Sequence, residues 1–271
     1  MTAGIASTAV VSKHAQLGDN VTIGHGTIVH DNVVIGDNTR IDEFCVIGSE
    51  TGADLAPLML GAQSRIRSHS VLYEGSTFGD RLETGHHVLL RAGANVGTNL
   101  RIGSYSSLEG AMTIGDYCRF QGGVQAGPGS TLGNFVWVFS NVVLTNDPLP
   151  PSHVFRPITL EDGAVVALGA MTLPGCQIGK GSFVAAGARV STQIPAGVFV
   201  TGDNNIAGPV TKLMDLEAGI RHPWMRHFAD SFPEEAQPRI NALHEEVLTA
   251  AKEWRSQQQV VSMRNAQPAN V

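Results

Sequence analysis

The sequence returns to an aliphatic residue at every sixth position over most of its length. The repeat covers residues 11–47, 60–144 and 160–190, and the recurring position, here called i, is almost always Ile, Leu, Val or Phe. An amphipathic helix cannot keep this period, because its turn of about 3.6 residues would spread such positions around the whole cylinder. A flat strand would show a period of two. The spacing instead predicts short strands joined by tight turns and stacked in parallel.

The expected fold class is an all-β solenoid, a parallel β-helix with a short C-terminal α-helical tail. Three six-residue units would close one triangular coil, and the length of the repeat predicts about nine coils. Side chains at i would point inward and form the core. Glycine is frequent at i+1, and the 31 glycines of the chain suit corners that need φ > 0.

We expect two regions. The β-helix would span residues 1–211, with loop insertions near 49–59 and 145–159, where the period is broken. Residues 212–271 carry more charge and less glycine, which predicts a helical tail with one or two shorter helices within 213–232. Pro238 can occupy the first turn of a longer helix. The apolar stripe of that helix would consist of Ile240, Leu243, Val247, Ala251 and Trp254. The tail would cap the open end of the prism or pack against a neighbouring chain.

Charge and composition argue against several classes of protein. The net charge of −6 and the pI of about 5.9 do not suit a protein that binds nucleic-acid phosphates. No apolar run approaches the roughly 18–20 residues of a membrane span, and no secretory signal is evident at the N-terminus. The 3 cysteines suit a reducing cytoplasm better than a disulfide framework. Cys45, Cys118 and Cys176 each lie four residues after an i position, which predicts a buried, unreactive slot.

The six-residue pattern of residues 5–210 resembles the hexapeptide-repeat acyltransferases. This resemblance, rather than the spacing, implies that the coil is left-handed and that three prisms form a homotrimer. It also implies active sites in the clefts between neighbouring prisms, with coenzyme A lying along the C-terminal coils.

The loop at residues 145–159 interrupts the repeat and is the better candidate for a functional loop. The stretch from Val142 to Val190 resembles N-acyltransferases that act on nucleotide-linked amino sugars, in which a T-N-D-x-x-P loop precedes an L-P-G-x-x-I-G coil. The resemblance places Asn146 and Asp147 at the acceptor. Asp147 stands where galactoside and xenobiotic acetyltransferases carry a catalytic histidine, which argues against that branch. The alternative is that Asn-Asp-Pro only starts a turn.

A second stretch, IRSHSVLYEGSTFGDRLETGHHVLLRAG, resembles the same amino-sugar group. The matching residues are Ile66, Arg67, Ser68, Tyr73, Thr84, Gly85, His86 and Arg91. The sequence departs from that group at Ala92, where glutamate is common, which leaves the exact sugar open. His86 and His87 fall at corner positions i+2 and i+3, so at least one should be exposed.

A zinc site is an alternative, because trimeric carbonic anhydrases share this prism. His25 and His30 have a suitable spacing, but no third histidine follows at the expected distance. We therefore expect no metal.

The predicted function is a cytoplasmic N-acyltransferase that uses acetyl-CoA, or another acyl-CoA, on the amine of a nucleotide-linked amino sugar. His86 and Asp147 would be catalytic, as base and as orienting group, although members of this group can lack a side-chain base. Asn146, His87, Tyr73 and Arg91 would bind the substrate. The residues expected along coenzyme A are Ala167, Gly169, Ala185, Gly187 and Lys212. The alternatives are acylation of another small amine or hydroxyl, such as an aminoglycoside-like natural product, and a non-catalytic β-helix scaffold.

Overall fold

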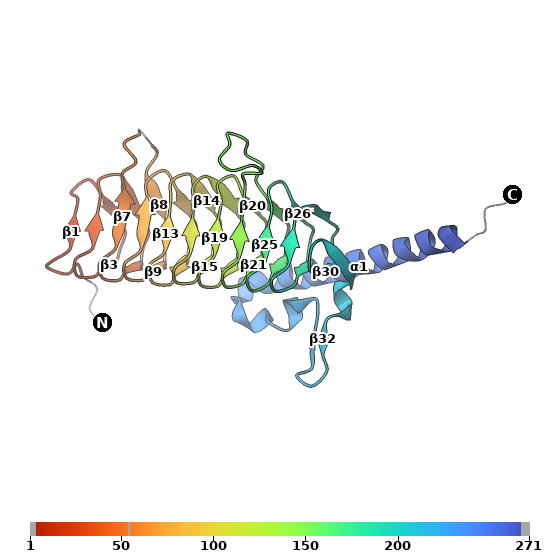
Figure 1. Ribbon diagram of the computed structural model, residues 1–271. Coiled ribbons are helices and arrows are strands. Elements are labelled where there is room, and N and C mark those ends of the chain that lie inside the picture. The colour runs from red at the N-terminus through yellow and green to blue at the C-terminus, as the bar shows by residue number, and fades with distance from the viewer. Residues whose placement is uncertain (1–3, 54, 267–271) are drawn as a thin grey trace.

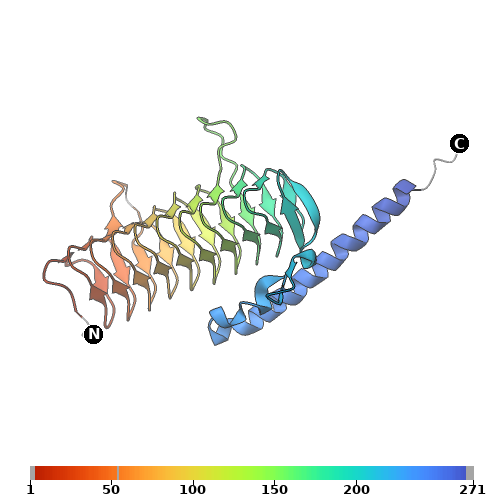
Figure 2. The ribbon, with the colours of Figure 1, turned by 60° about the horizontal axis from the view of Figure 1, so that its bottom comes forward.

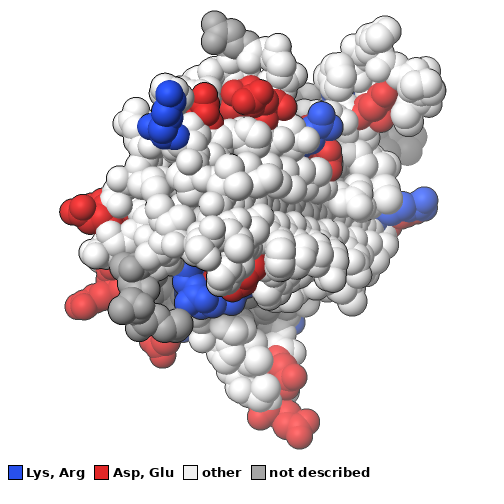
Figure 3. Space-filling view, turned by 90° about the vertical axis from the view of Figure 1, so that its left-hand side faces the viewer, with Lys and Arg blue, Asp and Glu red and all other residues white. Residues whose placement is uncertain are grey.

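The computed structural model describes residues 4–53 and 55–266, which form a prism of stacked coils with a helix beside one end (Figure 1). The fold is a left-handed parallel β-helix, as predicted. Val10 pairs with Ile28 and Thr22 with Arg40, so each coil contains three six-residue units. Seen from the N-terminal end, charged side chains lie around the rim of the prism, and the face of the first coil is largely uncharged (Figure 3).

Three sheets form the walls of the prism. The first sheet contains β1 (Val10–Val11), β4 (Ile28–Val29), β7 (Val46–Ser49), β10 (Val71–Tyr73), β13 (Leu89–Leu90), β16 (Ser107–Leu108), β19 (Gln125–Ala126), β22 (Val143–Leu144), β25 (Met171–Thr172) and β28 (Arg189–Val190). The second sheet contains β2 (Gln16–Leu17), β5 (Val33–Ile35), β8 (Leu58–Leu60), β11 (Thr77–Phe78), β14 (Ala94–Val96), β17 (Met112–Ile114), β20 (Thr131–Leu132), β23 (Thr159–Leu160), β26 (Gln177–Ile178) and β29 (Gln193–Ile194).

The third sheet has one more strand than the others. It contains β3 (Thr22–Ile23), β6 (Arg40–Ile41), β9 (Arg65–Ile66), β12 (Glu83–Thr84), β15 (Arg101–Ile102), β18 (Arg119–Phe120), β21 (Trp137–Val138), β24 (Val165–Val166), β27 (Phe183–Val184), β30 (Val198–Thr201) and β31 (Asn205–Pro209). The last of these, β31, runs antiparallel to β30 and ends the sheet. We call the turn from the first to the second sheet the first corner, from the second to the third sheet the second corner, and from the third back to the first sheet the third corner.

The described residues form ten coils rather than the predicted nine. The difference comes from Ile194 and Val200, which are both buried and lie in parallel strands although they fall outside the six-residue spacing. The unit after Val190 is shortened to four residues and moves both strands out of the period, so counting the period alone missed them.

The core and the corners follow the sequence pattern. Side chains at i are buried along the whole prism, as Ile47, Leu90 and Leu144 illustrate. The three cysteines are free and buried, as predicted. Burial raises the pKa of the Cys45 and Cys176 thiols to about 11 and that of the Cys118 thiol to about 12, so the reactive thiolate is disfavoured at neutral pH.

Both breaks in the repeat lie at the first corner. One loop joins β7 to β8 and the other joins β22 to β23, and the two project from the same edge of the prism (Figure 1). On the four coils between them this corner carries mostly small residues, including Gly75, Gly93, Gly110 and Gly129.

The tail contains more than the predicted helices. Its elements are η1 (Val210–Lys212), β32 (Met214–Asp215), β33 (Ile220–Arg221), η2 (Trp224–Arg226), η3 (Ala229–Ser231), η4 (Glu234–Ala236) and α1 (Gln237–Ala266). The antiparallel pair β32–β33 was not predicted, because its two strands are too short to show a period. Pro238 lies in the first turn of α1, as expected.

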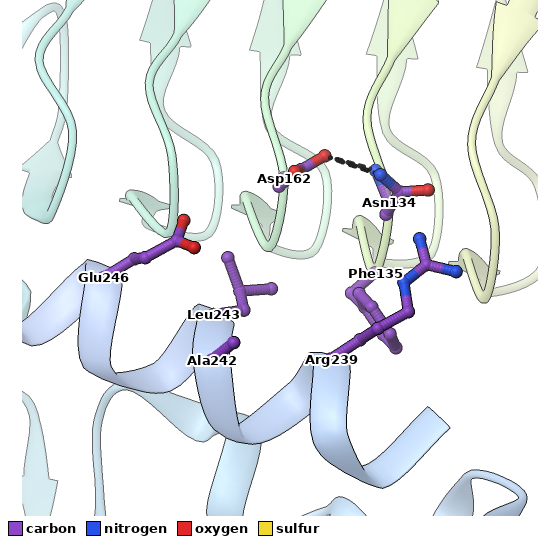
Figure 4. Close-up of a pocket in the computed structure, with 7 residues that line it drawn as sticks. All are labelled: Asn134, Phe135, Asp162, Arg239, Ala242, Leu243 and Glu246. Carbon is purple, nitrogen blue, oxygen red and sulfur yellow. Dashed lines mark hydrogen bonds between the residues drawn. The ribbon is translucent and has the colours of Figure 1, made fainter. Parts of the chain in front are cut away.

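Helix α1 packs along the second corner of its own chain (Figure 2), and Trp254 of this helix packs against the core of the prism. Leu243, Val247 and Ala251 lie against the corner glycines Gly163, Gly181 and Gly197, where a Cβ atom would clash with the helix. Figure 4 shows Leu243 and Arg239 of α1 facing Asp162 and Phe135 of the corner.

Aromatic side chains fix the rest of the tail to the outer face of the third sheet. Trp224 and Phe232 lie on Trp137, and the guanidinium of Arg119 lies 4.4 Å from the centre of the Phe232 ring. None of the helices that the structure describes is both long enough and apolar enough to cross a membrane.

Candidate functional site

His86 lies exposed at the third corner, between β12 and β13. Its Nδ1 is 2.8 Å from the hydroxyl of Ser68 on the preceding coil, and its backbone N–H donates to the hydroxyl of Ser104 on the next coil at 2.9 Å. The first contact orients the ring and leaves Nε2 as the nitrogen that can exchange a proton with a ligand, and the second holds the backbone of His86.

His87 is exposed beside it, and its ring belongs to a ladder of stacked rings. Its ring centre lies 4.7 Å from that of His69 and 5.1 Å from that of Tyr105, and Phe44 continues the stack beyond His69 at 5.2 Å. All four residues occupy the same corner position with φ near 60°. The stack therefore holds the His87 ring between His69 and Tyr105, whereas the His86 ring is not part of the stack.

A hollow of about 290 Å³ opens next to His86 on the third sheet. Ser104, Arg67, Arg101 and Glu83 line it. Glu83 accepts from Arg67 at 2.8 Å and lies 3.5 Å from Arg101, so one carboxylate orients two guanidinium groups. Two arginines around one acid leave a positive surface that suits a phosphate-bearing ligand.

Beyond His86, the third corner becomes a lane of small residues. Gly122 and Gly123 lie at this corner one coil after Tyr105. Later coils place Ala167, Gly169, Ala185 and Gly187 at the same corner. A Cβ atom on Gly169 or Gly187 would meet nothing within 4 Å, so the surface here is open.

Backbone donors line this lane. The N–H groups of Gly122, Ser140 and Leu168 donate to no other residue that the structure describes. A row of unpaired N–H groups along one edge can donate hydrogen bonds to the carbonyl oxygens of an extended ligand. Lys212 lies on η1 near the same end of the prism, exposed, with Nζ 3.5 Å from the carbonyl oxygen of Ala207.

Tyr73, Arg91, Asn146 and Asp147 lie at the first corner instead. Tyr73 and Arg91 hold the same position on successive coils, and Arg91 lies 3.7 Å from Glu109 on the next coil. Asn146 donates to the carbonyl oxygen of Pro128 at 3.1 Å.

Asp147 organises its own loop. Its carboxylate accepts from the N–H of Leu149 at 2.9 Å, and from the N–H and the hydroxyl of Ser152 at 2.9 and 2.6 Å. These bonds, that of the Ser152 hydroxyl foremost, lower the pKa of Asp147. Within one chain Asp147 therefore stabilises a turn, which is the alternative to a role in acceptor binding.

One chain does not bring the predicted site residues together. His86, His87 and the lane of small residues share the third corner, whereas Tyr73, Arg91, Asn146 and Asp147 share the first. His86 precedes β13 and Asp147 follows β22, three strands further along the first sheet, which is about 14 Å at the usual strand spacing.

Sequence reasoning missed the immediate partners of His86. Ser68 and Ser104 stand at the same corner position as His86 on the coils before and after it. The six-residue repeat could have revealed these partners, because residues that hold the same position on adjacent coils become neighbours. Arg101 was missed in the same way.

No group of three or more His, Cys, Asp or Glu side chains within the described ranges is placed to hold a metal ion. Nδ1 of His25 lies 2.9 Å from the hydroxyl of Thr8, and His30 lies 3.6 Å from Glu50.

A family model, the bacterial transferase hexapeptide (six repeats), matches residues 14–49. This match and the parallel β-helix show that the chain contains hexapeptide repeats of the bacterial transferase type. This hexapeptide-repeat protein is 40% identical over 72 residues to a 2,3,4,5-tetrahydropyridine-2,6-dicarboxylate N-acetyltransferase of Staphylococcus aureus (strain bovine RF122 / ET3-1). The match covers 27% of the chain and 29% of that relative, so the chain spans less than a third of the curated relatives' length.

Among solved structures, the UDP-N-acetylglucosamine acyltransferase of Arabidopsis is similar to this hexapeptide-repeat protein. The likeness covers 95% of this chain and 91% of the other, with a TM-score of 0.65 and 18% identity. At that identity the likeness supports the fold.

Proposed function

We propose that the protein is an acyl-CoA-dependent N-acyltransferase, using acetyl-CoA, that acts on the amine of a nucleotide-linked amino sugar. The observation that carries the proposal is the arrangement of the third corner. There an exposed imidazole, a hollow with two arginines and a lane of small residues follow one another along a single edge. These three features suit an amine, a diphosphate and a pantetheine arm, respectively.

In the proposed reaction, the acceptor amine attacks the carbonyl carbon of the thioester. A C–N bond forms, the C–S bond breaks, and coenzyme A leaves as a thiolate. Nε2 of His86 takes the proton lost by the amine and can pass it to the thiolate. One of the unpaired N–H groups near Gly122 would hold the oxyanion of the tetrahedral intermediate.

The acceptor would be held at two places. Arg67 and Arg101 would bind its diphosphate, and His87 would lie beside the sugar. Coenzyme A would run along Ala167, Gly169, Ala185 and Gly187, with its phosphates toward Lys212. The proposal includes a cytoplasmic location, where three unpaired thiols stay reduced.

The proposed site is completed by a second chain of a homotrimer. Because one chain separates the first corner from the third, the loop at 145–159 of one chain would lie over the third corner of its neighbour. Asn146, Asp147, Tyr73 and Arg91 would then face the acceptor across the cleft. Leu149 and Phe155, exposed at 76% and 65% near the tip of that loop, would be covered in such a contact.

A second candidate acceptor is a small amine without a nucleotide. It is favoured by the printed name of the curated relatives, an N-acetyltransferase acting on a tetrahydropyridine dicarboxylate. Carboxylates could take the place of the diphosphate at Arg67 and Arg101.

The deciding experiment follows thiol release from acetyl-CoA with a panel of nucleotide-linked amino sugars and of small amines carrying carboxylates. We expect turnover with one of the nucleotide-linked sugars, and its loss in Arg101→Gln but not in Arg255→Gln. Turnover confined to the small amines would support the second candidate. Absence of turnover with every acceptor and acyl donor tried would leave a non-catalytic scaffold and defeat the proposal.

A further inference from the structure

A cavity of about 430 Å³ lies between the tail hairpin and α1. Its ionisable lining residues are Arg221, His222, Arg226, His227 and His244. All of them are basic, although the chain as a whole has a net charge of −6. Every residue that lines the cavity belongs to the tail, so it is separate from the third corner.

Two of the imidazoles lack the partners that buried polar groups normally have. Nδ1 of His222 and Nδ1 of His244 are buried without a hydrogen-bond partner among the described residues, and His244 is only 7% exposed. Nε2 is therefore the nitrogen of each ring that is left to meet a ligand. Burial lowers the pKa of both rings; the charge of His227 lowers that of His222 further, and the charge of Arg226 lowers that of His244.

The positive charge around the cavity is only partly neutralised. Glu245 of α1 pairs with Arg226 and raises the pKa of His244 slightly against the other effects. Arg221 forms no ion pair with any residue in the described part of the chain. The cavity thus gathers donors and positive charge without an anion to match them.

We propose that this cavity binds a phosphate-bearing small molecule, with inorganic diphosphate as the simplest ligand. Guanidinium groups donate pairs of hydrogen bonds to phosphate oxygens, and imidazolium groups add charge-assisted donors. A bound anion favours the charged form of His222 and His244, so binding takes up protons and tightens as the pH falls. The ligand ties the hairpin to α1, because the cavity is formed by both.

The test is calorimetric titration of the full chain with inorganic diphosphate at about pH 6 and pH 8, at constant ionic strength in sodium chloride. We expect saturable binding that is several-fold tighter at the lower pH. Arg221→Gln removes an exposed arginine and should weaken binding by about tenfold or more. The matched control is Arg255→Gln, which removes an exposed arginine of α1 outside the cavity and should leave the affinity unchanged.

Three outcomes overturn the proposal: no saturable binding, equal weakening by the two substitutions, or binding that Arg221→Gln does not change. The last would place the anion elsewhere, such as the hollow beside His86, and would leave the proposed enzymatic function intact. The same titrations are made with coenzyme A and with UDP. The ligand whose affinity falls in Arg221→Gln is the kind of phosphate compound that the cavity binds.

Discussion

At the residue scale, side chains of one coil position residues of the next. The Ser68 hydroxyl orients the His86 ring without a carboxylate partner, and the Ser104 hydroxyl accepts the backbone N–H of His86 from the other side. A hydroxyl partner orients the imidazole but contributes no charge to stabilise the imidazolium. In the proposed reaction, Nε2 takes the proton of the amine and passes it on to the leaving thiolate.

The first prediction concerns this ring. His86→Ala should lower kcat by about 100- to 10,000-fold, the usual contribution of a general base, with little change in the binding of coenzyme A. Ser68→Ala should cause a smaller loss, because it frees the ring to rotate without removing it. Steady-state kinetics checks this, with His25→Ala as the control, because His25 is an exposed histidine of the same corner whose Nδ1 also lies 2.9 Å from a hydroxyl, that of Thr8. A His86→Ala enzyme within about threefold of wild type would mean that the thiolate takes the proton directly.

The second prediction separates the two roles of Asp147. Removing its carboxylate deletes a charged hydrogen-bond acceptor from the proposed site, so Asp147→Ala should weaken acceptor use by about 10- to 150-fold and leave acetyl-CoA kinetics unchanged. Ser152→Ala disturbs the same loop but keeps the carboxylate. Equal losses in the two variants would assign Asp147 to the turn alone, and so would acceptor constants that stay within about twofold of wild type in Asp147→Ala.

The six-residue repeat predicted which residues face outward at a corner, and it placed His86 and His87 at such positions. It could not show that Asp147 bonds to Ser152, because such loop contacts depend on a backbone path that no period describes. The sequence also could not show how residues of the first corner would meet those of the third, since in the proposed site the two corners belong to different chains.

At the scale of elements, the tail is held by a match between glycines and a helix. Gly181 stands at the second corner, and a Cβ atom there would lie 2.2 Å from a methyl group of Val247. The corner and the helix are thus shaped for one another. The helical spacing of apolar residues in the tail predicted α1 and its apolar stripe, yet not the face of the prism that receives it, because glycine is common at every corner.

The third prediction uses a matched pair of glycines. Gly181 and Gly187 have similar φ values of 62° and 68°, but a Cβ on Gly187 would meet nothing within 4 Å. Gly187→Ala should cost only the left-handed strain of roughly 1–2 kcal/mol. Gly181→Ala should cost a further 1–3 kcal/mol or so, because the helix must move. Denaturant unfolding followed by tryptophan fluorescence compares them, and equal midpoints would show that α1 does not press on this corner.

At the scale of the whole molecule, the proposed site needs more than one chain, because its residues lie at two corners of a single chain. The fourth prediction is that the protein is a stable trimer at micromolar concentration, which light scattering measures. A monomer would rule out a site shared between chains.

The trimer also predicts a specific complementation. If His86 and Asp147 of one site come from different chains, co-refolding inactive His86→Ala with impaired Asp147→Ala in equal amounts creates intact sites. Random mixing into trimers gives about one intact site in four. Activity no higher than the sum of the separate variants would place both residues in the same chain or outside the site.

The antiparallel strand β31 has a consequence for how the molecule meets its own copies. An open β-helix could in principle grow end to end, since each terminal coil offers unpaired backbone groups to the next molecule. Here β31 folds back on β30, and Asn204 accepts the N–H of Ser191 at 2.8 Å, so part of the C-terminal edge is already occupied. At this end of the prism the third sheet is therefore closed to pairing with another copy, which disfavours end-to-end growth and suits the proposed homotrimer, whose chains would meet at their sides.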